Sequence, residues 1–135
     1  MARLILDTGV LIGVARGRLG LASVVTDEDD VAVPAVVVAE FLAGVIQDHD
    51  PGRKAQQRGF LDNFLTMIPV APYDMDTIER HAELLAHTRV NGCPRGAHDL
   101  IIAATAIVTD RTLLTTDAKA GFDELPGVSV QLIAR

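Results

Sequence analysis

Residues 3–16 read RLILDTGVLIGVAR, a short apolar run that stops at an acid and leads into a second apolar segment. The run RLILD predicts a buried β-strand that ends at Asp7, because short apolar runs bounded by polar residues suit strands covered on both faces. The segment TGVLIGVAR that follows predicts a helix. Together the two segments predict the first strand–helix unit of an α/β fold.

The rest of the chain repeats this alternation of short apolar runs and longer helical patterns. Further strands are expected around Val31–Val33 and in IPVAPY (68–73), TLLTTD (112–117) and GVSVQLIAR (127–135), the last of them at an edge. Helices are expected over 35–47, 51–67, 76–90 and 97–108. Strands that alternate with helices of ten or more residues predict a mostly parallel sheet with helices on both faces, a three-layer α/β/α architecture.

Two of the helices carry signals for where they begin. Pro34 can begin the helix over 35–47, because a first-turn position needs no amide donor. Asp76 and Glu79 have capping-box spacing at the start of DTIERHAELLAHTRV. In that helix the apolar positions recur at helical intervals, at Ile78, Ala82, Leu85 and Ala86.

Composition fits a single domain over residues 1–135 with an aliphatic core. Hydrophobic residues make up 49% of the 135 residues and aromatic residues only 4%, so the core must consist of Val, Ile, Leu and Ala. The single cysteine, Cys93, favours a reducing compartment without structural zinc. No apolar stretch reaches the roughly 20 residues that span a bilayer, so we expect a cytoplasmic protein without a membrane partner.

Four acidic residues lie at or beside the expected carboxyl ends of strands. Asp7 and Asp117 end strands, and Asp99 opens the apolar helix AHDLIIAATAIV. Each of these three also suits a helix cap or a turn, the more ordinary role of a single Asp at such a junction. Glu40 differs, because its neighbours on one face of its helix are apolar or small. An ionised carboxylate is costly there unless it is paired, bound to metal or able to reach solvent.

Taken together, the four acids favour a metal site. Ligands of parallel α/β sheets bind outside the carboxyl ends of the strands, so this fold would bring the acids toward one crevice. Two unit charges about 4 Å apart repel by roughly 4 kcal/mol at an effective dielectric of 20, so such a group needs a counter-charge. Carboxylate ligands select a hard cation, Mg²⁺ or Mn²⁺.

These acids belong to motifs that resemble a known family. LILDTGVLI, VVVAEFLAG, HDLIIAATA and LLTTD resemble, in order and spacing, the acidic motifs of PIN-domain ribonucleases. In a chain of this length they are most similar to VapC-type toxins of bacterial toxin–antitoxin pairs. The resemblance runs from about Ile5 to Leu132. The chain departs from it at Asp117, where many relatives carry Asn, and Phe122 comes five residues later where an aromatic residue often comes four later.

The resemblance implies a parallel sheet with strand order 3-2-1-4-5. It also implies that the four acids are the site carboxylates, with Asp7 and Asp99 in direct contact with metal. A supporting hydroxyl is implied at Thr115, although Thr116 suits that role equally well by position. Beyond the site, the resemblance implies cleavage of RNA, a homodimer, and silencing by a VapB-like antitoxin whose C-terminal segment covers the cleft.

The expected reaction is metal-assisted hydrolysis of an RNA phosphodiester, which leaves a 5′-phosphate and a 3′-hydroxyl. A net charge of −6 disfavours a nucleic-acid partner. Without the four acids, however, 14 acidic and 12 basic residues leave a charge of only −2. The candidate RNA contacts are Arg95, Arg16 and Lys119, among a wider set that also includes Arg18, Arg53, Lys54, Arg58 and Arg89. Arg95 leads because it precedes Asp99 by four residues.

One other hypothesis is excluded and one remains. A dehalogenase-like phosphatase also begins with a strand that ends in an acid, but it needs a second Asp two residues later, where this chain has Gly9, so it does not fit. The alternative that remains is a non-catalytic PIN-like scaffold that binds RNA or protein and keeps the acids for structure. Binding of a divalent cation distinguishes the scaffold from the enzyme.

Overall fold

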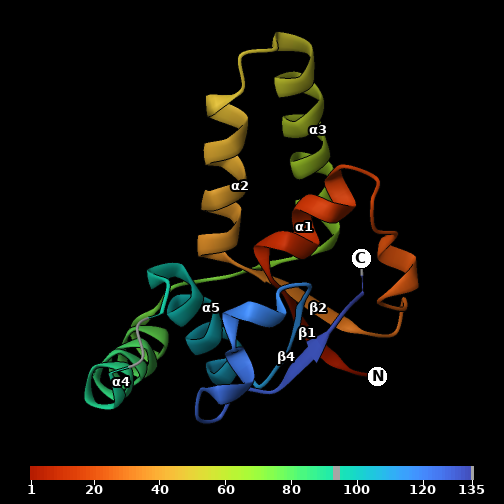
Figure 1. The fold of residues 1–135 in the computed structure, drawn as a ribbon. Helices are drawn as coiled ribbons and strands as arrows, with labels where there is room; N and C mark the ends of the chain where they lie inside the picture. The colour runs from red at the N-terminus through yellow and green to blue at the C-terminus, as the bar shows by residue number, and fades with distance from the viewer. Residues whose placement is uncertain (93–94, 135) are drawn as a thin grey trace.

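The computed structural model describes residues 1–92 and 95–134, and Figure 1 shows their arrangement. The five strands are β1 (Arg3–Leu6), β2 (Asp30–Pro34), β3 (Val70–Ala71), β4 (Thr112–Thr115) and β5 (Val130–Leu132). The five α-helices of this part are α1 (Thr8–Ala15), α2 (Ala35–Gln47), α3 (Pro51–Met67), α4 (Met75–Asn91) and α5 (Ala97–Val108). Cys93, on which the expectation of a reducing compartment rests, lies outside the described residues.

All five strands pair in parallel, in the order β3-β2-β1-β4-β5. This confirms the predicted α/β fold with strand order 3-2-1-4-5, and it places β5 at an edge as expected. The middle strand β1 is the most enclosed, because Ile5 and Leu6 are fully buried. Leu6 lies opposite Leu114 of β4, so the residues that follow these two strands emerge side by side at the carboxyl edge.

The helices form two groups around the sheet. In Figure 1, α2 and α3 stand side by side as an antiparallel pair next to α1, whereas α4 packs along α5. The apolar body of α5 is part of the core, with Ile102, Ala103 and Ala106 each at most 1% exposed. No helix within the described residues is long and apolar enough to cross a membrane.

The first corrections to the predictions concern Pro34 and the third strand. Pro34 is the last residue of β2 and the N-cap of α2, with extended backbone angles (φ −64°, ψ 146°), so α2 begins at Ala35. The proline ring fixes φ at about −65°, a value that both extended and helical residues can adopt. The ψ angle of 146° therefore makes Pro34 extended rather than helical. The strand predicted within 68–73 is confined to Val70–Ala71, because Pro72 has no amide hydrogen with which to continue it.

Helix α4 begins earlier and faces differently than its sequence suggested. Its N-cap is Asp74, whose Oδ1 accepts hydrogen bonds from the backbone amide (3.1 Å) and the hydroxyl (3.0 Å) of Thr77. The predicted capping box at Asp76 and Glu79 is therefore wrong, and Asp76 lies in the first turn.

The face of α4 that packs inward carries two threonines. Its buried residues are Thr77, Leu84 and Thr88, whereas Ile78 is 38% exposed. Of the other predicted apolar positions, Leu85 is half-buried, and Ala82 and Ala86 are exposed. Thr88 can be buried because its hydroxyl donates to the carbonyl of Leu85 (3.0 Å). The helical period was predicted correctly, but packing against α5 selected a different face.

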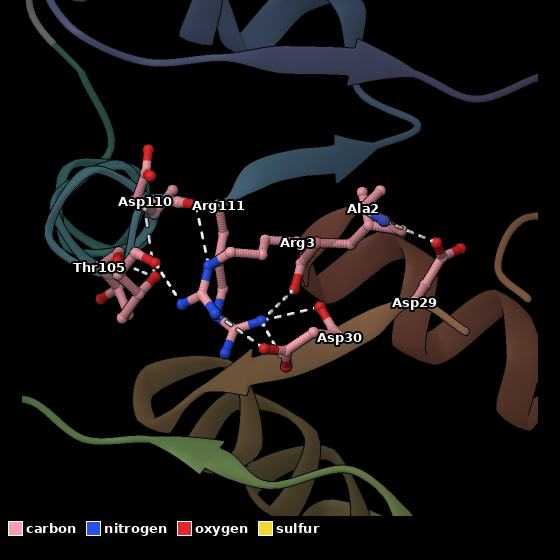
Figure 2. A network of polar contacts seen from close by, with 10 residues as sticks. Ala2, Arg3, Asp29, Asp30, Thr105, Asp110 and Arg111 are labelled. Atoms are coloured by element: carbon pink, nitrogen blue, oxygen red, sulfur yellow. Dashed lines mark hydrogen bonds and ion pairs between the residues drawn. The ribbon is translucent and has the colours of Figure 1, made fainter. Parts of the chain in front are cut away.

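Two arginines tie the strands together at the amino edge of the sheet. Figure 2 shows Arg111, whose Nη1 donates to the carbonyls of Leu4 (3.2 Å) and Asp30 (2.8 Å) and to Asp30 Oδ1 (3.0 Å). Arg3 lies nearby, and its guanidinium contacts Asp30 Oδ2 (2.8 Å) and the carbonyl of Thr109 (2.7 Å). This network joins β1, β2 and the end of α5 and leaves the carboxyl edge to the acids.

Candidate active site

Asp7 is the most buried of the four acids. It follows β1 directly, its amide donates to the carbonyl of Leu114 (3.0 Å), and its side chain is only 7% exposed. Its Oδ1 accepts from the backbone amide of Thr8 (2.8 Å), and its Oδ2 accepts from the hydroxyl of Thr115 (2.6 Å). Asp7 is the N-cap of α1, so the capping role weighed from the sequence is real. Its Oδ2 nevertheless points to the adjacent strand.

The charge of Asp7 is destabilised by its surroundings. Burial raises the pKa of this carboxyl, and the negative charges of Asp117 and Glu40 raise it further. The hydrogen bonds from Thr115 and Thr8 act in the opposite direction, but burial outweighs them. Asp7 is thus a carboxylate that a nearby cation would stabilise.

Glu40 reaches the same region from α2. Its Oε1 accepts from the hydroxyl of Thr8 (3.1 Å) and lies 3.5 Å from Nδ1 of His98. The side chain is 29% exposed, so the carboxylate lies partly in solvent rather than in the apolar surface between helix and sheet. The sequence gave no signal for the role of Thr8, which the strand-to-helix turn brings against α2.

Asp99 lies in the first turn of α5, but it does not cap that helix. The N-cap is Gly96, which offers no side-chain hydrogen bond, and the Asp99 carboxylate accepts no hydrogen bond from any described residue. Burial raises the pKa of Asp99, as do the charges of Asp7, Asp117 and Glu40, and only the positive charge of His98 lowers it. A half-buried carboxylate without a donor is available to a ligand.

Asp117 and Thr115 complete the carboxyl edge. Asp117 caps the 3₁₀ turn Ala118–Ala120, and its Oδ1 accepts from the amides of Lys119 (3.0 Å) and Ala120 (3.2 Å). The Thr115 hydroxyl accepts from the amide of Asp117 (3.0 Å) and donates to Asp7, so one buried hydroxyl holds both acids. Thr116, the other candidate for this position, has a buried hydroxyl without a protein partner among the described residues.

The carboxylate oxygens of the four acids are chemically suited to bind a hard divalent cation. All four acids supply oxygen ligands, and no Lys or Arg is among the principal influences on the pKa of Asp7 or Asp99. Within residues 1–92 and 95–134, however, no three His, Cys, Asp or Glu side chains lie close enough to share an ion. A cation bound by three or more of these acids would therefore require them to move closer together.

The three predicted RNA contacts occupy different environments. Arg95 is 11% exposed, and its guanidinium donates to the carbonyls of Ala120 (2.6 Å) and Gly121 (2.9 Å) and pairs with Glu124 (2.8 Å). These contacts fasten the segment before α5 to the turn after Asp117. Arg16, at the end of α1, and Lys119 are exposed. The structure thus ties Arg95 to the turn after Asp117 and leaves the other two accessible.

The repulsion at this edge predicts that Asp99→Asn stabilises the protein in EDTA. A folded-state pKa above the ordinary 3.8 means that the folded form loses stability as the pH rises through the folded pKa. At neutral pH the charged Asp99 therefore destabilises the fold. We expect the substitution to raise the melting temperature by a few degrees at pH 7. This increase in melting temperature over wild type should become smaller below pH 4, where wild-type Asp99 is protonated. An equal or lower melting temperature at pH 7 would contradict the placement of these charges.

Comparisons with known proteins agree with this fold. The family model described as PIN domain matches residues 4–128. Among curated proteins, the chain is 26% identical over 127 residues to Ribonuclease VapC of Rickettsia bellii, a match that covers 94% of this chain and 93% of that protein.

Two solved structures share the fold over nearly their whole length. VapBC2 from Rickettsia felis, bound to a DNA fragment from its promoter, superposes with a TM-score of 0.86 at 22% identity and covers 97% of this chain and 98% of that chain. VapBC-5 from Mycobacterium tuberculosis gives a TM-score of 0.76 at 27% identity and covers 100% of both chains. With a central parallel sheet, acids at its carboxyl edge and a family match over most of its length, the chain belongs to the PIN domain family.

Proposed function

We propose that this protein is a metal-dependent endoribonuclease and the toxin of a toxin–antitoxin pair. The observation that carries the proposal is Asp99, a half-buried carboxylate without a protein donor whose pKa is raised by burial and by three other acids. A structural acid would have a hydrogen-bond or ion-pair partner. The similarity to Ribonuclease VapC of Rickettsia bellii supports RNA as the substrate.

In this proposal Asp7 and Asp99 hold Mg²⁺ or Mn²⁺, and Glu40 and Asp117 complete the site. When bound, such an ion polarises the scissile phosphate and lowers the pKa of an attacking water. The protein orients the ligands: the Thr115 hydroxyl fixes Asp7 Oδ2 and the Asp117 amide, and the Thr8 hydroxyl fixes Glu40. Hydrogen bonds from Thr115 and Thr8 also favour the ionised form of Asp7, which is the form that binds a cation.

The exposed cations supply the electrostatic attraction for the substrate. We assign phosphate contacts to Arg16 and Lys119, because their side chains are accessible. Arg95 is assigned a positioning role, because its guanidinium is already bound to Ala120, Gly121 and Glu124. It would maintain the spacing between Asp99 and Asp117 rather than contact RNA.

A VapB-like antitoxin is the proposed partner. Solved structures that share this fold include VapBC complexes from Rickettsia felis and Mycobacterium tuberculosis. An antitoxin that covered the four acids would block both the cation and the substrate. The homodimer, the cytoplasmic location and the single-domain organisation over 1–135 stay predictions.

The test of the proposed function is cleavage of single-stranded RNA by the purified protein with Mg²⁺ or Mn²⁺ and in excess EDTA. We expect cleavage only with the divalent ion, and products with a 5′-phosphate and a 3′-hydroxyl, because the nucleophile is water. Ligation of the products to an adaptor that requires a 5′-phosphate detects these ends. Products with 2′,3′-cyclic phosphate would exclude this chemistry.

Binding of Mn²⁺ separates the enzyme from the non-catalytic scaffold. A ligand at 100 times its Kd stabilises the folded state by about 2.7 kcal/mol, so the enzyme should melt at a higher temperature with Mn²⁺. Asp99→Asn should lose most of this increase, and Asp62→Asn, an exposed acid on α3 paired with Arg58, should retain it. A scaffold with structural acids would show no shift in any of the three proteins.

A further inference from the structure

A basic groove runs from the end of α1 across α2 to the first half of α3. Its cavity measures about 790 Å³, and its polar lining is Arg16, Arg18, Asp48, Arg53, Gln56 and Gln57. Figure 1 shows these three helices as neighbours on one side of the molecule. Three arginines and one aspartate give the groove a formal charge of +2, in a chain whose net charge is −6.

Two of the arginines in the basic groove carry uncompensated charge. Arg53 pairs with Asp48, since its Nη2 donates to Oδ1 at 2.6 Å. Arg16 and Arg18 are exposed and make no side-chain hydrogen bond or ion pair with any residue in 1–92 or 95–134. Free guanidinium groups are suited to phosphate oxygens, which they can contact through two parallel hydrogen bonds.

The basic groove begins about one helical turn from Glu40. Glu40 and Gly44 lie one helical turn apart on the same face of α2, and neighbours four residues apart on a helix are about 6 Å apart. Asp48, a further turn along, caps the helix and lines the groove. A Cβ added at Gly44 would meet no atom within 4 Å, so the groove is open at Gly44.

A second, smaller cavity connects the same arginines to the other side of the site. It measures about 190 Å³ and is lined by Gly9, Ile12 and Thr116 together with Arg16 and Arg18. Gly9 follows Thr8, and Thr116 lies between Thr115 and Asp117. Arg16 and Arg18 therefore stand between the basic groove and a cavity that reaches the carboxyl edge of the sheet.

We propose that the basic groove binds the single-stranded RNA that extends from the scissile phosphate. Arg16 and Arg18 contact backbone phosphates, and Gln56 and Gln57 offer amides to base edges or 2′-hydroxyls. Phe60 supplies a fixed aromatic wall, because its ring packs against Phe64 with a centroid separation of 5.6 Å. Basic side chains beside an aromatic surface are the usual platform for single strands. The inference rests on the proposed function, because it takes the four acids as the place where the strand is cut.

The test measures binding of a mixed-sequence single-stranded RNA to the Asp99→Asn protein, which is not expected to cut it. In that background, Arg16→Gln together with Arg18→Gln should raise Kd about tenfold at low salt. Loss of two phosphate contacts should reduce the slope of log Kd against log salt concentration by about 1.4, since each contact to a single strand contributes about 0.7. The matched control is Arg3→Gln with Arg80→Gln, two arginines outside the groove lining whose side chains are 43% and 40% exposed, and it should change neither quantity.

The outcomes separate this inference from the proposed function. If wild-type protein cuts RNA but the groove variant matches the control in Kd and slope, the groove inference is wrong and the nuclease stands. If no RNA is cut but the groove variant alone loses affinity and slope, the groove stands and the nuclease is wrong. A third outcome would overturn the inference. If the protein binds poly-L-glutamate more tightly than RNA, and the groove variant loses the binding of poly-L-glutamate, the groove is a site for an acidic polypeptide.

Discussion

Asp7→Asn is expected to reduce RNA cleavage by at least about 10²-fold, because it removes the charge of the most buried carboxylate in the proposed metal site. Asn is close to Asp in size and keeps an oxygen that can accept from the amide of Thr8. Its amide group would face the Thr115 hydroxyl, which can reverse its role and accept. The substitution therefore tests charge with little change in packing. Initial rates with saturating Mg²⁺ give the measurement.

The control for Asp7→Asn is Asp62→Asn, an exposed acid that is 61% accessible and paired with Arg58 on α3. It should cleave RNA at the wild-type rate. Circular dichroism and the melting temperature establish that Asp7→Asn is folded, and a gain in stability is expected because the pKa of Asp7 is raised by burial. A folded Asp7→Asn protein that kept more than about a tenth of wild-type activity would exclude Asp7 as a metal ligand.

The sequence predicted the sheet well because its three central strands β2, β1 and β4 are short runs with aliphatic residues at their centres. RLIL became β1, and Asp7 follows it as the pattern indicated. TLLT became β4, but the prediction that this strand ends at Asp117 is wrong, because β4 ends at Thr115 and Asp117 caps the 3₁₀ turn that follows. Asp99 could likewise be placed at the start of an apolar helix, and α5 spans Ala97–Val108 as expected. Such features are local, so composition and periodicity are enough to find them.

Features set by packing between distant segments could not be predicted. The position of Arg95 four residues before Asp99 favours an RNA contact, but no sequence pattern indicates its hydrogen bonds to carbonyls 25 and 26 residues away. The inward face of α4 depends on α5. Of its two buried threonines, Thr77 donates to the carboxylate of the N-cap Asp74 and Thr88 donates to the carbonyl of Leu85. The arrangement of the four acids also depends on electrostatics between segments, which no single motif reports.

Arg111 is another residue that no sequence pattern singled out, and Arg111→Met is expected to lower the free energy of unfolding by about 2–3 kcal/mol. Its Nη1 donates to the carbonyls of Leu4 and Asp30 and to Asp30 Oδ1 (Figure 2). Its side chain is only 10% exposed. Methionine fills a similar volume but cannot donate, so a charged donor to three acceptors is lost. Urea denaturation monitored by circular dichroism gives the free energy.

Arg3→Met is the matched control for Arg111, because both arginines contact Asp30 at the amino edge of the sheet. Arg3 is 43% exposed, so water can replace its contacts and an exposed ion pair contributes at most about 1 kcal/mol. The difference between the two variants in free energy of unfolding therefore measures how much burial strengthens an arginine's contacts with Asp30 and nearby carbonyls. Because the network lies at the edge opposite the acids, both variants should cut RNA at the wild-type rate wherever they remain folded. A smaller loss for Arg111→Met than for Arg3→Met would mean that the Arg111 contacts do not hold β1 to β2.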